Sequence, residues 1–430
     1  MTQARTVSHL NGSVSIRREL WGVLQQGDKM RTTRDSISGN IRRIAVAAAP
    51  ALALALIAMQ PVEAQTFTVL YTFTGGADGG TPMATPILYN GNVYGTTQGG
   101  GANAAGAVYE LNFASRHEAP LHSFTGADGS GPIAGLVQGS NAQFYGVAYR
   151  GGQYNDGTMF KLSPSGTFTL LHSFSGPPAE GMGPAGTLVF DPTGDLFGTT
   201  YVGGNSKGWG TVYEYAVSGT YTTGQNFSPD GALPRAGLFF DAGKLYGTTC
   251  GCGSEPYGGS IYQVGLVGAL YTFTGGADGS QPLGSLTTDG KGNLYGTTSA
   301  GGSGNFGLGY GVVYKFNLST STLTVLHTFS GPDGSVPASA LSWDSAGNLY
   351  GTTTEGGAYG YGNVFELSPT GTMTTLHDFT GGADGGKPFA GVLVDDVGNV
   401  WGAASAGGSA QSPGGYGTLF IITPPAAGIR

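Results

Sequence analysis

The feature that most constrains this fold is a seven-residue motif that recurs along the chain. GNLYGTT stands at residues 292–298 and again at 347–353, and five near-copies carry the same aromatic–glycine pair. The aromatic residues of the seven copies are Tyr94, Tyr145, Phe197, Tyr246, Tyr295, Tyr350 and Trp401. Successive copies are 49 to 55 residues apart. This period is too long for a β-helix coil and is typical of one four-stranded propeller blade, so the sequence predicts seven similar sheets.

Each period contains four short runs with the composition of β-strands. In the third copy they cover 157–162, 168–174, 185–191 and 195–200, and apolar and polar residues roughly alternate in most of them. Half-buried strands show this alternation. We interpret the run with the recurring motif as the outer strand of its blade. Its aromatic side chain would then cover the outer edge of the blade core, and its glycine would permit a bend or a close backbone approach.

Two partial units at the ends of the repeat region complement each other. The stretch 67–73 has the pattern of a second strand without a first, and 417–423 that of a first strand without a second. An open solenoid would need caps, whereas a closed circle pairs the two fragments and leaves no free sheet edge. We therefore predict an all-β fold, a seven-bladed β-propeller of four-stranded antiparallel blades over residues 65–424. It is closed by pairing of the C-terminal strand with the N-terminal blade, and a short tail follows at 425–430.

Residues 1–64 have the character of an N-terminal extension and export signal. A pair of arginines precedes an apolar run at 44–59, and small residues follow up to Ala64. This arrangement predicts a signal peptide that is cleaved after about Ala64, with a retained membrane anchor as the alternative. Met30 is an alternative start of translation. We expect the mature protein to be secreted or periplasmic.

The mature chain is expected to be acidic. Residues 1–64 hold eight of the 18 Lys and Arg residues and four of the 26 Asp and Glu residues, which leaves a net charge of −12 on the remainder. Nucleic acids and anionic lipids bind basic patches, so we expect no nucleic-acid partner and no membrane insertion after signal removal. Glycine accounts for 81 of 430 residues, while aromatic residues reach 11% and charged residues only 10%. Disordered chains show the opposite balance, and we expect a folded monomer with many tight turns.

The repeating unit as a whole resembles a known family. Its pattern, GNLYGTT…GG…GTVYEL…TVLHSF…DG..P.AGL, is similar to the tandem repeat of the choice-of-anchor GloVer-containing proteins over essentially all of 66–424. The resemblance implies an exported bacterial protein, often held at the cell surface by a C-terminal anchor. This chain ends in TPPAAGIR instead of a sorting tail, so we expect release. The resemblance implies no activity and no catalytic residues.

Two recurring polar features are interpreted as structural. An acid, followed by Gly and four residues later by Pro, joins the second and third runs of each unit, and the seven acids are Asp78, Asp128, Glu180, Asp230, Asp278, Asp333 and Asp384. Four units place a His two residues before the Phe of the second run, namely His122, His172, His327 and His377. The other units have Tyr or Gln there. Calcium loops have a different spacing, and Tyr or Gln replaces a metal-binding His poorly. We expect turn and strand contacts, and neither a metal nor a cofactor.

Other motifs that suggest chemistry are discounted. GNSKG at 204–208 fits the nucleophile motif G-x-S-x-G, and GSGNFG at 302–307 fits G-x-G-x-x-G. Both lie in loops between strands, whereas each motif requires a strand that leads into a helix. Cys250 and Cys252 are the only cysteines. Their spacing is too short for a relaxed disulfide, which leaves a strained cross-link or two inert thiols as alternatives.

The loops after the motif strands are the remaining candidates for function. In an antiparallel blade, the links from fourth to first run and from second to third run open on the same face, which therefore carries all the glycine-rich loops. Our candidate binding residues there break the repeat: Tyr149, Arg150, Tyr154, Tyr201, Lys207, Trp209, Tyr257, Phe306, Tyr310, Tyr359 and Tyr416. Exposed aromatic side chains among small residues suit sugar rings or a protein partner. The alternative is that they only pack the loops over the blades.

We therefore predict an exported, non-catalytic binding or interaction scaffold for an extracellular glycan or protein. The alternative is a polysaccharide-acting lyase or hydrolase at the mouth of the central channel, with Arg150, Asp156 and Glu355 as its polar residues. A structural matrix protein whose repeats only assemble is a third hypothesis. No residue is predicted to be catalytic, because the loops hold few acids and no evident carboxylate pair.

Overall fold

The computed structural model describes residues 65–204, 208–227, 233–251, 258–302, 309–409 and 414–425. These residues belong to a unit that spans Ala64–Arg430. Their regular elements are all β-strands, and within them there is no helix with the length and hydropathy needed to cross a bilayer. The described part of the chain is therefore all-β, as predicted.

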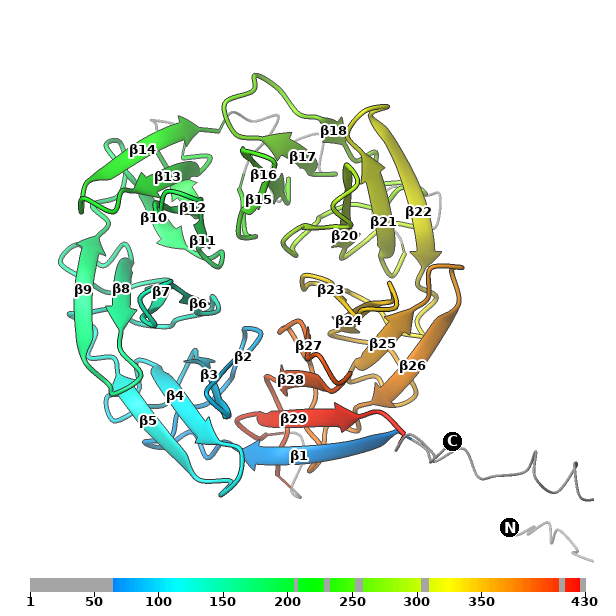
Figure 1. Cartoon of the computed structure of the whole chain (residues 1–430), viewed down its shortest axis with the longest axis horizontal. Coiled ribbons are helices and arrows are strands. Elements are labelled where there is room, and N and C mark those ends of the chain that lie inside the picture. The colour runs from blue at the N-terminus through cyan, green and yellow to red at the C-terminus, as the bar shows by residue number, and fades with distance from the viewer. Residues whose placement is uncertain are drawn as a thin grey trace, which may run out of the picture. The chain divides into compact units, whose positions relative to one another are not determined.

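Seven sheets stand around a central axis and extend from the axis to the rim (Figure 1). We number the blades in chain order and give their strands from the axis outward. Blade 1 contains β2 (Ile87–Tyr89), β3 (Asn92–Thr97), β4 (Ala107–Asn112) and β5 (Glu118–Ser123). Blade 2 contains β6 (Val137–Gln138), β7 (Phe144–Ala148), β8 (Thr158–Leu162) and β9 (Phe168–Ser173). Blade 3 contains β11 (Val189–Phe190), β12 (Leu196–Gly203), β13 (Thr211–Tyr215) and β14 (Tyr221–Asn226).

The remaining blades follow the same plan. Blade 4 contains β15 (Phe239–Asp241), β16 (Lys244–Thr249), β17 (Ser260–Gln263) and β18 (Tyr271–Thr272). Blade 5 contains β19 (Thr287–Thr288), β20 (Asn293–Thr298), β21 (Val312–Asn317) and β22 (Thr322–Thr328). Blade 6 contains β23 (Ser342–Trp343), β24 (Leu349–Thr353), β25 (Asn363–Leu367) and β26 (Met373–Asp378). Blade 7 contains β27 (Leu393–Val394), β28 (Val400–Ala404), β29 (Thr418–Thr423) and β1 (Thr66–Thr72).

Blade 7 closes the circle in the way the sequence predicts. Its three inner strands come from the end of the chain and its outermost strand, β1, comes from the beginning. β1 and β29 pair antiparallel from Thr66↔Thr423 to Thr72↔Thr418, and they lie side by side in Figure 1. The predicted seven-bladed propeller and its mode of closure are confirmed. Blade 3 has an additional short strand, β10 (Gly181–Pro184), which pairs with β12.

The prediction that the recurring motif forms the outer strand of each blade is wrong. The motif forms the second strand from the axis, for example β20 and β24, and the run that follows the third strand forms the rim. A second strand has a neighbour on each side and an adjacent blade on each face, so β24 is buried along its whole length. The aromatic side chain of the motif is buried in four blades, with Tyr94 and Trp401 only 2% and 5% exposed, and it is half-buried at Tyr145, Phe197 and Tyr295.

The glycine after the aromatic residue has a packing reason. A Cβ built on Gly351 would lie 2.6 Å from Cζ of Phe365, because the aromatic side chain of the third strand lies directly over the second. The polar tip of the motif aromatic is bonded to the hairpin turn before it. Tyr350 donates to Asp344 at 3.1 Å and Trp401 donates to Asp395 at 2.9 Å. A side-chain hydrogen bond thus links the motif strand to the hairpin turn that precedes it.

The core is divided among the interfaces between blades. One cluster combines Val93 and Tyr109 of blade 1 with Trp401 and Leu419 of blade 7, and similar clusters join the other neighbours. Each blade therefore buries its faces only against the next blade, which allows a repeat of this length without one large core.

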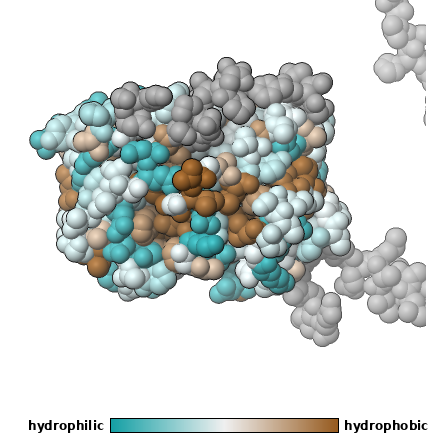
Figure 2. Space-filling model, turned by 90° about the horizontal axis from the view of Figure 1, so that it is seen from above, coloured by the Kyte–Doolittle hydropathy of each residue, from teal (hydrophilic) through white to brown (hydrophobic). Residues whose placement is uncertain are grey.

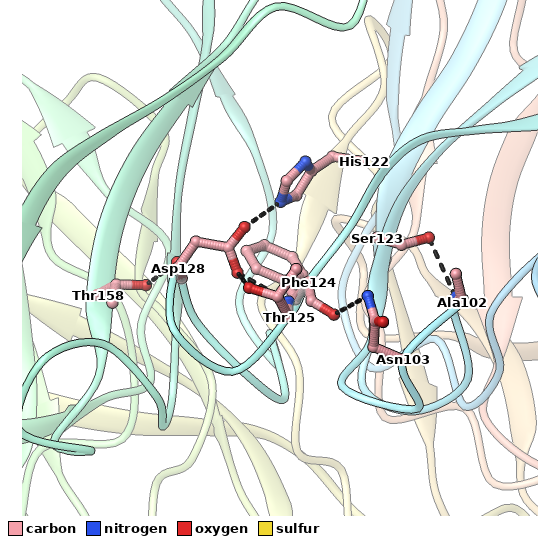
Figure 3. Close-up of polar contacts among 8 residues, drawn as sticks. All are labelled: Ala102, Asn103, His122, Ser123, Phe124, Thr125, Asp128 and Thr158. Carbon is pink, nitrogen blue, oxygen red and sulfur yellow. Dashed lines mark hydrogen bonds and ion pairs between the residues drawn. The ribbon is translucent and has the colours of Figure 1, made fainter.

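The recurring acid and His contact each other in the four units that have the His, and Figure 3 shows the contact in blade 1. Asp128 accepts hydrogen bonds from the Thr125 backbone N–H and hydroxyl, each at 2.8 Å, and lies 2.9 Å from His122 Nε2. The His172–Glu180, His327–Asp333 and His377–Asp384 pairs repeat the contact at 2.9–3.1 Å. Where the His is replaced, Tyr71 and Tyr271 donate to Asp78 and Asp278. The structural interpretation is confirmed for the other six acids, whereas Asp230 lies outside the described residues.

The His side chains also join neighbouring blades. His122 stacks on Phe168 of blade 2, with ring centroids 3.8 Å apart, and His377 stacks on Phe67 of blade 7 at 3.6 Å. Burial lowers the pKa of His122 and of His377, although the acid beside each partly offsets it. The neutral form of these two side chains is therefore favoured at neutral pH.

Blade 4 departs from the regular plan at its rim. Its outer strand β18 pairs with β17 at only two positions, and the preceding turn leaves Leu266 and Val267 43% and 100% exposed. Figure 2 views the rim from the side of Figure 1 on which this blade lies, and apolar residues gather in the middle of that view. The rim of blade 4 therefore combines a short outer strand with exposed apolar side chains in the turn before it.

Candidate functional site

Both kinds of glycine-rich link open on one face, as predicted. The link that enters a blade forms a bridge with the loop after the second strand of that blade, and examples are Ser130↔Arg150, Ser280↔Ala300 and Ser335↔Glu355. We call this side the loop face. The opposite side carries the short hairpin turns, including the turn at Asp344.

The residue before the proline of each link has a left-handed backbone. The φ angles are 57° at Thr81, 61° at Gly131, 66° at Gly183, 64° at Leu233, 56° at Gln281, 55° at Val336 and 52° at Lys387. Such a φ is strained for a β-branched residue such as Val336. Its N–H donates to the Tyr310 carbonyl of the preceding blade at 3.0 Å, and its carbonyl accepts from Thr354 at 3.2 Å. These bonds fix the backbone from which each innermost strand starts.

The residues after these prolines surround the axis and line a cavity of about 430 Å³ on the loop face. They are Met83, Ile133, Ala185, Arg235, Leu283, Ala338 and Phe389. We call this cavity the channel mouth. A second cavity of about 290 Å³ shares Thr85, Thr187 and Ser285 with it and continues along the innermost strands, where Leu136 and Leu188 line it. The channel is therefore lined mainly by apolar and small side chains.

Arg235 is the only charged residue that lines the channel mouth in the described part of the chain. Its Cζ lies 4.6 Å from the centroid of the Tyr201 side chain. Tyr149 also lines the mouth, and Arg150 lies beside it with Cζ 5.9 Å from the ring centroid. Cation–π contacts of this kind orient a guanidinium group without neutralising it.

A second group of aromatic residues lies on the loops outside the mouth. Tyr154, Tyr310, Tyr359 and Tyr416 are 52%, 50%, 61% and 51% exposed. Tyr416 packs on the glycine turn of the next blade, since a Cβ on Gly75 would lie 2.4 Å from its ring atoms. Tyr310 lies against Gly331 in the same manner. These two side chains are held in place while half of their surface faces solvent.

A family model for the Gloeobacter/Verrucomicrobia repeat matches residues 55–262, 179–309 and 240–430. The matches together span the whole propeller. This chain belongs to the Gloeobacter/Verrucomicrobia repeat family. The resemblance drawn from the repeating unit is thereby confirmed.

Several solved structures are similar to this family member at low identity. A Bacteroides fragilis protein described as a 6-phosphogluconolactonase is 16% identical, with 74% of this chain and 90% of that chain covered and a TM-score of 0.47. A gluconolactonase from Xanthomonas campestris is 14% identical, with 84% and 90% covered and a TM-score of 0.41. TolB from Acinetobacter baumannii is 15% identical, with 67% and 64% covered and a TM-score of 0.41, so the match spans less than two thirds of TolB. A search of the curated proteins found no match.

The binding residues predicted from the sequence lie in separate places in this repeat protein. Tyr149 and Tyr201 line the channel mouth, with Arg150 beside it, and the exposed tyrosines lie on the outer loops. Trp209 is half-buried and packs against the buried Leu233 and Cys250. Lys207, Tyr257 and Phe306 lie outside the described residues.

The polar group suggested for an enzyme does not assemble. Arg150 and Glu355 occupy equivalent bridge positions on blades 2 and 6, so the circle of blades keeps them apart. Across the described ranges there is no group of three or more metal-ligating side chains. Cys250 is fully buried and disulfide-bonded, and Cys252 lies outside the described residues.

The sequence interpretation missed Arg235 and the apolar residues of the channel mouth. The available signal was the position after the link proline, which differs from unit to unit although the proline itself always stands four residues after the recurring acid. A residue that varies at a fixed position of the repeat is a candidate for binding, because the blades do not all need it for their structure. The loop tyrosines were selected by the same reasoning. The position was missed because its place around the axis emerges only when the seven blades close.

Proposed function

We propose that this repeat protein is exported and acts as a monomeric, non-catalytic scaffold whose loop face binds an extracellular glycan. The observation that carries the proposal is the set of four half-exposed tyrosines on the outer loops. Aromatic side chains stack on the apolar faces of sugar rings and offer a large contact area at low entropic cost. The loops between them consist mainly of Gly, Ala, Ser and Asn, which leave backbone N–H and C=O groups accessible to sugar hydroxyls.

The immobilisation of the tyrosines supports this function. Binding orders side chains at an entropic cost, which a preorganised surface has already met. Tyr310 and Tyr416 are held against glycine turns of the adjacent blades, and the propeller beneath them is closed by the pairing of β1 with β29. In their described residues, the loops between the second and third strands hold no large aliphatic side chain, whereas a protein-binding core would be expected to be rich in them.

The features of the N-terminus support export. The apolar run at 44–59 with arginines before it and Ala64 after it has the pattern of a signal peptide. The disulfide-bonded state of Cys250 fits an oxidising compartment. The net charge of −12 on the remainder fits neither nucleic acid nor an anionic membrane surface as partner.

An oligosaccharide array with the purified protein tests the proposal. We expect binding to at least one extracellular oligosaccharide, and a decrease of about tenfold in the double variant Tyr154→Ala, Tyr359→Ala, since each stacking contact contributes about 0.5–1.5 kcal/mol. Val397→Ala is the matched control, because Val397 is 73% exposed in a hairpin turn of the opposite face. Equal binding by the double variant would refute the proposed surface. Capture of a protein in place of any glycan would refute the ligand class, and release of new reducing ends would indicate an enzyme.

A further inference from the structure

The channel mouth differs chemically from the outer loops. Of the seven residues that follow the link prolines, four carry large apolar side chains, and Met83, Ile133 and Phe389 are examples. Two more are alanines, and the seventh is Arg235. A sugar would find few polar partners on such a wall, while an apolar group would be desolvated by it. The cavity of about 430 Å³ has the size of a small-molecule site.

Arg235 gives this apolar cavity a fixed positive charge. Leu233, two residues earlier, is hydrogen-bonded to two blades. Its N–H donates to the Trp209 carbonyl of blade 3 at 2.9 Å, and its carbonyl accepts from the Cys250 N–H of blade 4 at 3.3 Å. The carbonyl of Ala236 accepts a hydrogen bond from Thr199 at 2.9 Å. The backbone on both sides of Arg235 is thus held, and the Tyr201 side chain supports the guanidinium group.

Within the described ranges, no carboxylate pairs with Arg235. Through the stretches that the structure describes, each salt bridge joins a His to an acid at the rim, and the lining of the mouth contains no carboxylate. A guanidinium group has five N–H donors that match a carboxylate in a bidentate manner. An exposed cation among apolar side chains, in a protein that is acidic as a whole, is complementary to a local negative charge on a ligand.

We propose that the channel mouth binds a small organic anion, a carboxylate carried on an apolar body. The carboxylate pairs with Arg235 next to Tyr201, and the apolar body lies over Met83, Leu283 and Phe389. The second cavity, lined by Leu136 and Leu188, accommodates the end of a longer chain. This site is separate from the glycan surface, so either proposal can fail alone.

Four probes of related structure test the chemistry by isothermal titration calorimetry: octanoate, octanol, octylamine and acetate. We expect octanoate to bind most tightly. Its affinity should be at least tenfold higher than that of octanol, because a hydrogen-bonded charge pair contributes enough binding free energy for a change of this size. Octylamine and acetate are expected to bind weakly, since one carries the wrong charge and the other lacks the apolar body. Octanol that binds as tightly as octanoate would overturn the role of the charge, and no binding of octanoate at millimolar concentration would overturn the site.

Two substitutions and a matched control locate the site. Arg235→Gln is expected to lower octanoate affinity at least tenfold and to leave octanol unchanged, whereas Phe389→Ala is expected to weaken both. Lys291→Gln is the control, because it also removes an exposed positive charge, and Lys291 lies in a hairpin turn of the opposite face. Arg235 and Phe389 are both exposed, so thermal unfolding should be unchanged in both variants. Unchanged octanoate binding in Arg235→Gln would refute the proposal, whatever the variant does on the oligosaccharide array.

Discussion

Glu118 places a carboxylate where three other blades place an aromatic side chain. It is the first residue of β5, and its equivalents that stack on the His of the preceding blade are Phe67, Phe168 and Tyr221. In blade 7, which precedes blade 1 in the circle, the position of that His is occupied by Tyr71, whose hydroxyl donates to Asp78 at 3.0 Å. Oε1 of Glu118 is buried and has no hydrogen-bond partner among the described atoms. The junction at which the circle closes therefore contains two carboxylates close together.

This environment raises the pKa of Glu118 from 4.5 to about 7, first because burial disfavours the charge and second because Asp78 repels it. The Tyr71 hydroxyl partly offsets both effects. A shift of this size corresponds to about 3 kcal/mol at full strength. Glu118 is only half-buried, so solvent screening reduces the effect, and we expect about 1–2 kcal/mol.

The direction in which stability changes with pH follows from the linkage between proton binding and folding. Because the pKa is higher in the folded state, the unfolded chain loses its proton first, and stability falls as the pH rises from 4.5 through about 7. Glu118→Gln keeps the shape of the protonated form. Its free energy of unfolding should exceed that of the wild type by about 1–2 kcal/mol at pH 8, and by only a few tenths of a kcal/mol at pH 4.5.

Urea unfolding at pH 4.5, 6, 7 and 8, followed by tryptophan fluorescence, measures this difference. Glu355→Gln controls for the substitution itself, because Glu355 is exposed on an outer loop and such changes stay within about 0.5 kcal/mol. Glu118→Phe, which restores the aromatic residue of blades 2 and 7, should also remove the pH dependence. A gain for Glu118→Gln that is the same at every pH, or a loss at pH 8, would refute the reasoning.

Three further predictions concern the fold. Tyr314→Phe should keep or raise the free energy of unfolding, by up to about 1 kcal/mol, because the Tyr314 hydroxyl is buried without a partner among the described atoms; a loss above 1 kcal/mol in urea unfolding would contradict this. Asp128→Ala should cost about 2–3 kcal/mol in the same assay, since it removes the acceptor for Thr125 and His122, and a change below 0.5 kcal/mol would show the contact to be dispensable. Deletion of residues 418–430 removes β29, which lies between β28 and β1, and should abolish soluble monomer in size-exclusion chromatography because two sheet edges become free; a folded monomer would argue against closure as the source of stability.

Much of the architecture was predictable because repetition shows which residues every blade needs. The acid before Gly and the His two residues before Phe were predicted to make turn and strand contacts, and the pairs His122–Asp128 and His377–Asp384 confirm it. Complementary fragments at 67–73 and 417–423 predicted the closing pair of strands. These features depend on local sequence and on the rule that sheet edges must be paired.

The order of strands within a blade was not predictable in the same way. The motif strand was placed at the rim, although Tyr94 and Trp401 are buried. An alternating pattern shows that a strand has two environments, but a second strand and a rim strand can have similar patterns. The direction in which the chain crosses the blade decides between them, and that direction depends on how neighbouring blades pack.

The sequence by itself determined the number of blades, the closure and the contacts that every unit repeats, because these follow from periodicity, hydrogen bonding and the pairing of free edges. Only the tertiary structure decided which side chains share a cavity. Met83, Arg235 and Phe389 lie far apart in the chain, and they meet because each is the residue after a link proline in a closed circle of blades. A site formed by one residue from each repeat has no local signature, since no short segment contains more than one of its members.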